Sequence, residues 1–153
     1  MLLRVKLMKF ELSISINCSP EATFIFFRDK DQHKQKENSP VLVLERVTGL
    51  PVAVGTRYRE VVQMLPFYKS EIFSTITRYE PYEYLEEEFS SKGMQGHLAY
   101  QFFDYGGSTK LIQRESIYFS FPINLLYPII RQVLHRKLSE RLKEIKIILE
   151  QKI

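Results

Sequence analysis

The sequence lacks several features that would assign it to particular classes of protein. It has no tryptophan and a single cysteine, Cys18, so no disulfide bond can form within the chain. No stretch approaches the roughly 20 apolar residues that span a bilayer. The first residues are interrupted by Arg4 and Lys6 and form too short an apolar run for a secretion signal. We therefore expect a soluble, cytoplasmic protein.

Motifs of common catalytic and cofactor sites are also absent. The chain has no nucleophile elbow, no phosphate-binding glycine loop and no dinucleotide fingerprint. Its three histidines, His33, His97 and His135, are far apart, and none has a second ligand at metal-binding spacing. We expect these histidines to be structural or solvent-facing. The sequence predicts no cofactor and no metal site, and it identifies no catalytic residue.

The charge pattern does not favour nucleic acid as a partner. The net charge is +4, and basic residues are mixed with acidic ones except near the C-terminus. No basic run alternates with aromatic residues to form a stacking platform. The C-terminal segment carries Arg131, Arg136, Lys137, Arg141, Lys143 and Lys146. We interpret them as the wet face of a helix, with transient contact with an anionic membrane surface as the alternative.

The 153 residues are enough for one domain, 1–153, and 11 Phe and 9 Tyr demand a rich core or a lined pocket. Strict alternation of apolar and polar residues over 8–16 predicts a half-buried strand. Ser19-Pro20-Glu21 is a helix start, so a short helix should follow through about Phe27. Residues 29–38 should form a second short helix or a solvated loop.

A run of strands and one long helix complete the chain. Strands are predicted over residues 41–47, 56–64, 68–79, 84–90, 97–105 and 108–121, because glycine and proline turns separate β-rich segments. After Pro122 the apolar residues recur every three or four positions, which predicts an amphipathic helix of roughly 25–30 residues with Pro128 in its first turn. This order predicts an α+β fold, with a curved antiparallel sheet wrapped around the C-terminal helix.

The hairpin at Gly106-Gly107 sets a register that brings candidate site residues together. A two-residue turn pairs Tyr105 with Ser108 and, further along, Leu98 with Glu115. The face that carries these residues is the more apolar one, so we assign it to the concave side, under the helix. We expect a mostly apolar cavity there of at least roughly 300 Å³, and the alternative is a solid core in which the same residues are close-packed. The candidate ligand-binding residues are Tyr58, Glu60, Val62, Tyr100, Phe102, Gln113, Glu115, Ile117 and Phe119, roofed by Ile130 and Leu134.

The register of one strand pair stays open. A three-residue loop at Leu65-Pro66-Phe67 would put Tyr68, Ile72, Ile76 and Arg78 on the concave face. A two-residue loop would put Glu71 and Phe73 there instead. In the first case Arg78 would be the best partner for Glu60 and Glu115, which need one if they are buried and ionised. Glu86-Glu87-Glu88 alternates between faces, and we interpret it as a solvated edge.

Several segments together resemble a known superfamily. They are 18–24, 54–60, 76–81, 107–111 and the closing helix over 138–149, and they cover nearly the whole chain in the same order. The chain resembles the START-related, birch-pollen-allergen-like (SRPBCC) superfamily, in particular its polyketide cyclase/dehydrase-like branch. The resemblance implies a helix-grip fold with a cavity between sheet and helix. One departure is Glu37-Asn38-Ser39-Pro40, where members often carry a tryptophan.

Three functions compete, because this fold serves many activities. The first is non-catalytic binding or carriage of a hydrophobic small molecule, such as a lipid, isoprenoid or polyketide-like compound, and the sequence favours it. The second is a cyclase or dehydratase in which Glu60 or Glu115 acts as acid or base. The third is a protein-interaction module without a ligand.

Overall fold

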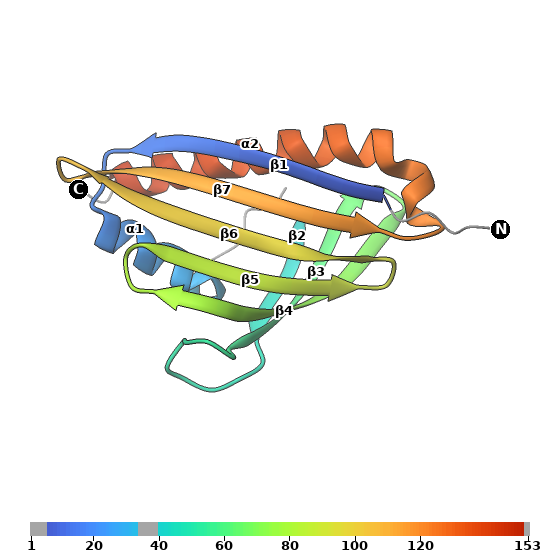
Figure 1. Cartoon of the computed structure of the whole chain (residues 1–153), viewed down its shortest axis with the longest axis horizontal. Helices are drawn as coiled ribbons and strands as arrows, with labels where there is room; N and C mark the ends of the chain where they lie inside the picture. The colour runs from blue at the N-terminus through green and yellow to red at the C-terminus, as the bar shows by residue number, and fades with distance from the viewer. Residues whose placement is uncertain (1–5, 34–39, 152–153) are drawn as a thin grey trace.

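The computed structural model describes residues 6–33 and 40–151 and shows one curved antiparallel sheet gripping a long helix (Figure 1). The elements are β1 (Lys6–Ile16), α1 (Pro20–Arg28), the 3₁₀ turn η1 (Lys30–Gln32), β2 (Val41–Arg46), β3 (Arg57–Leu65), β4 (Tyr68–Glu80), β5 (Tyr84–Ser91), β6 (Met94–Tyr105), β7 (Ser108–Phe119), the 3₁₀ turn η2 (Ile123–Leu126) and α2 (Tyr127–Gln151). The strands pair in the order β1-β7-β6-β5-β4-β3-β2. The predicted α+β helix-grip fold is confirmed. Of the expected second short helix only η1 is described, and residues 34–38 lie outside the described residues.

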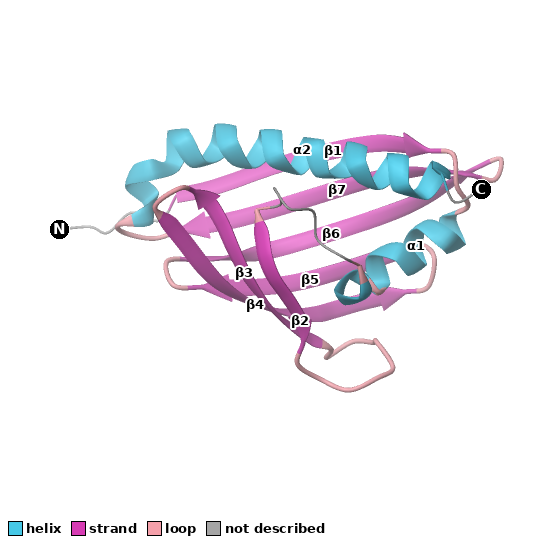
Figure 2. Cartoon of the chain, turned by 180° about the vertical axis from the view of Figure 1, so that it is seen from behind, coloured by secondary structure: helices cyan, strands magenta, loops and turns pink. Residues whose placement is uncertain are grey.

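Helix α2 runs along the concave face of the sheet, and α1 lies near its C-terminal end (Figure 2). Helix α2 buries Leu134, Leu142, Ile145 and Leu149, which recur at helical spacing. Pro128 is the second residue of α2, where a proline ring costs no hydrogen bond within the helix. No helix among the described residues is long and apolar enough to cross a membrane. The far end of α2 is tied to β1, because the backbone N–H of Asn17 donates to Glu150 at 2.8 Å and Lys146 Nζ donates to the carbonyl of Ser15 at 2.7 Å.

The structure resolves the open register of β3 and β4. The tip is Pro66-Phe67, but a bulge between Gln63 and Leu65 shifts the pairing so that Glu60 lies opposite Ile72. The body of the hairpin therefore has the register of a three-residue loop, with Ile76 buried and Glu71 and Phe73 exposed on the outer face. In β6 and β7, Tyr105 pairs with Ser108 and Leu98 with Glu115, as predicted.

The turn between β5 and β6 is tighter than the sequence suggests. Gly96 is not part of a break between strands but lies inside β6, opposite Ile117 and Phe89. A Cβ atom at Gly96 would collide with the carbonyl oxygen of Ser116 and lie 3.0 Å from Cζ of Phe89. The glycine therefore serves close packing within the sheet, whereas the turn itself uses Gly93 with positive φ.

The interior has two parts. The larger apolar cluster lies between α1, the sheet and the C-terminal half of α2, and it contains Ile16, Phe24, Phe27, Phe102, Leu111, Leu142 and Ile145. We call it the packed end. A smaller cluster of Met8, Ile117, Phe119 and Leu134 lies under the N-terminal half of α2. The candidate site lies between the sheet and this half of the helix.

Candidate functional site

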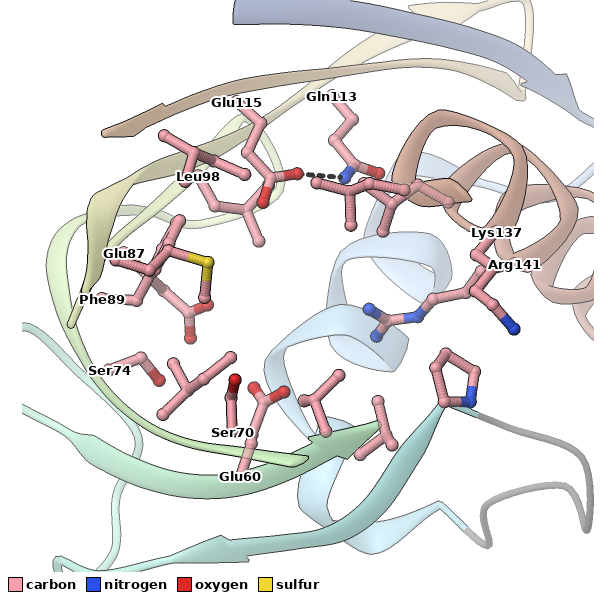
Figure 3. Close-up of a pocket in the computed structure, with 18 of the residues that line it drawn as sticks. Glu60, Ser70, Ser74, Glu87, Phe89, Leu98, Gln113, Glu115, Lys137 and Arg141 are labelled. Atoms are coloured by element: carbon pink, nitrogen blue, oxygen red, sulfur yellow. Dashed lines mark hydrogen bonds between the residues drawn. The ribbon is translucent and has the colours of Figure 1, made fainter. Parts of the chain in front are cut away.

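A cavity of about 160 Å³ lies between the concave face of the sheet and α2 (Figure 3). Of the eleven residues predicted to form it, nine line its wall: Glu60, Val62, Tyr100, Gln113, Glu115, Ile117, Phe119, Ile130 and Leu134. The volume is below the expected 300 Å³, and the long charged side chains of Lys30 and Arg141 also line the cavity. The site is therefore smaller and more polar than the sequence predicts.

Two predicted wall residues belong to the packed core instead. Tyr58 is 1% exposed and Phe102 is 4% exposed, and both are members of the large apolar cluster. The ring of Phe102 packs edge-on against Phe24 from α1, which the alternation along β6 does not reveal. Tyr58 reaches the site indirectly, because its ring face lies 4.4 Å from the ammonium of Lys30.

Lys30 brings a positive charge into the cavity from outside the sheet. Ser19 caps α1 by accepting a hydrogen bond from the Ala22 N–H, the helix ends at Arg28, and η1 then carries Lys30 over the concave face. Its ammonium lies 2.8 Å from Glu87 Oε1 and 3.5 Å from Glu60 Oε1. Burial alone would lower the pKa of Lys30, but the charges of Glu87 and Glu60 raise it above its usual range. Lys30 is therefore a charged bridge between two carboxylates and not a free amine nucleophile.

Glu115 has no such cation bridging it. Its carboxylate accepts a hydrogen bond from Gln113 Nε2 at 3.3 Å, on the wall opposite Glu60 (Figure 3). Burial raises the pKa of Glu115 to about 7, although Gln113 and Arg141 act to lower it. Tyr100 is close by in the same wall, and burial raises the pKa of its hydroxyl to about 12. Near neutral pH the carboxyl group of Glu115 can thus exchange its proton, whereas the phenol of Tyr100 keeps its own.

Arg141 reaches into the cavity from α2. Figure 3 shows its guanidinium group pointing from the helix toward the carboxylates of the opposite walls. Burial alone would lower the pKa of Arg141, but Tyr100 and the three glutamates together raise it, so the group stays charged. Lys137, one turn earlier, also lines the cavity. Lys146 donates a hydrogen bond to β1. Of the six basic residues predicted to face solvent, Arg131, Arg136 and Lys143 are therefore the ones that lie exposed on the surface of α2.

Arg78 does not partner the cavity glutamates, and the prediction that it would is wrong. A bulge between Ile76 and Arg78 reverses the alternation, so that Ile76 is 1% exposed while Arg78 lies on the outer face. There Arg78 pairs with Glu80 at 3.1 Å and stacks on the ring of Tyr84.

The reading of Glu86-Glu87-Glu88 as a solvated edge is also wrong for its central residue. Strand β5 is internal to the sheet, and Glu87 is 5% exposed on the concave face. The sequence does indicate that Glu87 lies on the concave face, because the apolar residues Leu85 and Phe89 share the face of β5 that carries it. Arg141 lies seven residues after Leu134 and so follows the apolar stripe of the helix. For Lys30 the sequence holds no comparable signal, since its position depends on how η1 meets the sheet.

The remaining candidates for chemistry lie outside the cavity. The ring of His33 stacks on Phe26, and its Nε2 is 2.8 Å from the Phe26 carbonyl. His97 is exposed beside Glu88, and His135 packs edge-on against Phe10. Within residues 6–33 and 40–151, no group of three or more His, Cys, Asp or Glu side chains could hold a metal ion.

Comparisons with known proteins support the fold and leave the activity open. No protein-family model and no curated protein sequence matches the chain. Among solved structures, Zhui aromatase/cyclase from a Streptomyces species superposes with a TM-score of 0.79 at 10% identity, covering 96% of each chain. One comparable part of the di-domain aromatase/cyclase StfQ superposes with a TM-score of 0.76 at 13% identity, covering 95% of this chain and 51% of that one.

Ara h 8.0201 superposes with a TM-score of 0.66 at 13% identity, covering 96% of this chain and 97% of its own. Identities this low establish similarity of fold and not of activity. The departure at Glu37-Asn38-Ser39-Pro40 falls mainly on residues 37–39, outside those that the structure describes. The sheet, the helix and these similar structures together show that the chain has a helix-grip fold, similar to that of the two aromatase/cyclases and of Ara h 8.0201.

Proposed function

We propose that this protein binds an apolar small molecule that carries a polar group, in the cavity between the sheet and α2. The observation that carries the proposal is the division of the cavity wall. One part is apolar, with Phe119, Ile130 and Leu134, and the other carries Lys30, Glu87, Glu115 and Arg141. Ligand sites combine these two features, because apolar walls supply affinity and a few polar groups fix orientation.

Blocking the cavity tests this proposal. Ile130 lines the cavity, while Ile129, its neighbour on α2, is 52% exposed. We expect Ile130→Trp to weaken binding of an apolar reporter dye at least about 10-fold, because the indole ring fills the space, and Ile129→Trp to leave it nearly unchanged. The chain has no tryptophan of its own, so the fluorescence of either new residue also reports directly on the ligand.

One result would contradict the proposed binding site. If Ile130→Trp and Ile129→Trp bind the dye equally well, the ligand does not occupy this cavity. Native mass spectrometry of protein purified from its own host gives a second test, since an apolar molecule that co-purifies with the wild type should be lost from Ile130→Trp.

A second candidate function is acid–base catalysis of the cyclase or dehydratase type. It is favoured by Glu115, whose carboxyl group lies in the cavity wall with a pKa raised to about 7 by burial. Two of the similar structures are described as aromatase/cyclases. With a poly-β-ketone as substrate, Glu115→Gln should abolish turnover while leaving substrate binding within a few-fold of wild type. Turnover that survives in Glu115→Gln would remove this candidate.

A further inference from the structure

The charges of the cavity fall into two sets. Lys30 is satisfied by two carboxylates, Glu87 at 2.8 Å and Glu60 at 3.5 Å. Arg141 enters from the opposite side, on α2, and forms no hydrogen bond and no ion pair with any residue of the described chain. Lys137, one helical turn before it, lines the same cavity and likewise has no such partner among the described residues.

A cation that leaves water needs an anionic partner, because desolvation otherwise costs more than the protein recovers. The carboxylates of the cavity supply negative charge, which raises the pKa of Arg141, but none of them accepts a hydrogen bond from its guanidinium group. Glu60 and Glu87 are engaged by Lys30, and Glu115 is engaged by Gln113. The helix therefore presents to the cavity a guanidinium group whose N–H donors are not used by the part of the chain that the structure describes.

We propose that the ligand of this cavity carries a carboxylate that binds Arg141, with its apolar body lying along α2 toward Leu134 and Ile130. This inference rests on the proposed function, and it specifies the class of ligand as carboxylic acids with an apolar body. The guanidinium group presents parallel N–H donors that match the two oxygens of a carboxylate.

The surroundings favour a monoanion over a dianion. Three glutamates line the cavity, and they would repel a second negative charge on the ligand head. The length of the site favours a medium-sized apolar body. Leu134 and Ile130 precede Arg141 by seven and eleven residues on the same helix face, which places them about 10 and about 16 Å away at 1.5 Å per residue, the span of roughly ten carbon atoms.

The test compares two probes that differ only in the head group, decanoate and decan-1-ol, by isothermal titration calorimetry with the full chain. We expect the wild type to bind decanoate at least about 10-fold more tightly than decan-1-ol, because the hydrogen bonds to Arg141 are charge-assisted. Arg141→Gln should abolish that preference. Arg136→Gln removes an exposed arginine from the same helix and should retain it.

Each result decides between the two proposals. If the wild type binds decan-1-ol as tightly as decanoate, the carboxylate inference is wrong and the binding function stands. If neither probe binds, the binding function fails for apolar chains and the inference fails with it. If the preference persists in Arg141→Gln, the carboxylate lies elsewhere and the assignment to Arg141 is overturned. The comparison of probes on the wild type holds even if Arg141→Gln proves unstable, and thermal melting of both variants identifies that case.

Discussion

The two ends of the interior are filled in different ways. At the packed end, the ring of Phe24 meets Tyr79, Tyr82 and Phe102 at centroid distances of 5.3–5.8 Å, and Phe24 itself is fully buried. At the cavity end, the space under α2 is shared between apolar side chains and a set of charged ones. Rings from a helix and a sheet can interlock without voids, whereas charged groups must keep their partners in reach and leave space around them. The cavity therefore exists where the polar groups are.

The sharpest test of this comparison is to place a carboxylate at each end. Leu142 is 3% exposed in the packed end, and Leu138, one turn earlier on α2, lies on the cavity wall beside Lys137 and Arg141. Leu142→Asp should remove cooperative unfolding altogether, because an unpaired charge in an apolar core costs a large share of a stability of about 5–15 kcal/mol. Leu138→Asp should remain folded with a lower melting temperature. Equal losses in thermal melts would show that the two ends do not differ.

Removing the bridging cation should have the next largest effect. Lys30→Met leaves Glu60 and Glu87 facing each other without a partner, and breaking a buried pair in this way costs about 3–5 kcal/mol. Chemical denaturation measures this loss. The double substitution Lys30→Met with Glu87→Gln should recover a large part of it, since the more deeply buried of the two uncompensated carboxylates is then gone. A double variant as unstable as the single one would show that Lys30 acts through packing alone.

The pH dependence of stability should reveal Glu115. Its pKa is about 7 in the folded protein and 4.5 ordinarily, so between these values the folded state binds more protons than the unfolded state. The contribution of Glu115 to the free energy of unfolding is then fully present below pH 4.5. It falls as the pH rises toward 7, by up to about 3 kcal/mol. The groups that face it are Gln113, Arg141, Glu60 and Glu87.

Glu115→Gln is the matched control for that profile, because it keeps the shape and removes the proton. The difference between the wild-type and Glu115→Gln unfolding free energies should decrease from pH 5 to pH 8, with the variant the more stable at the upper end. A difference that does not vary with pH would place the carboxyl group in contact with water.

The smallest effect is expected on the outer face of the sheet. Arg59 pairs with Glu71 at 2.7 Å and Glu45 at 3.1 Å, but these carboxylates are half exposed. Solvent screens such pairs, so Arg59→Gln should melt within about 2 °C of wild type. A loss comparable with that of Lys30→Met would contradict the view that burial, and not pairing, makes the cavity charges important.

Much of the fold follows from local patterns that the structure confirms. The helix start at Ser19-Pro20 and the hairpin at Gly106-Gly107 each depend on a few adjacent residues, and the stripe of α2 depends on a period that persists over seven turns. The cavity walls on β6 and β7 follow from that hairpin, because one turn fixes the pairing of two long strands.

The rest depends on irregularities and on contacts between distant segments. The bulge after Ile76 turns Arg78 to the outer face, and the bulge after Gln63 decides the face of β4. Neither bulge has a sequence signature, since each inserts one residue at no fixed motif. Lys30 enters the site from a segment with no periodicity, so only the assembled sheet shows where its ammonium goes. Glu87 and Arg141 are charged residues at positions where the pattern of the strand or helix calls for apolar ones. Such residues are the feature of the sequence that indicates the polar half of the site.

Gly96 limits how freely this sequence can vary. A side chain there would push against the backbone of β7 at Ser116 and against the ring of Phe89, which is part of the cavity wall. The hairpin glycines, Gly106 and Gly107, have open space around them, so a substitution there meets only backbone strain at positive φ, which asparagine bears better than most residues. Among homologous chains, position 96 should thus be the more strictly constrained, and any lineage that replaces this glycine must also shift the backbone of β7 at Ser116, which lies between the cavity-wall residues Glu115 and Ile117.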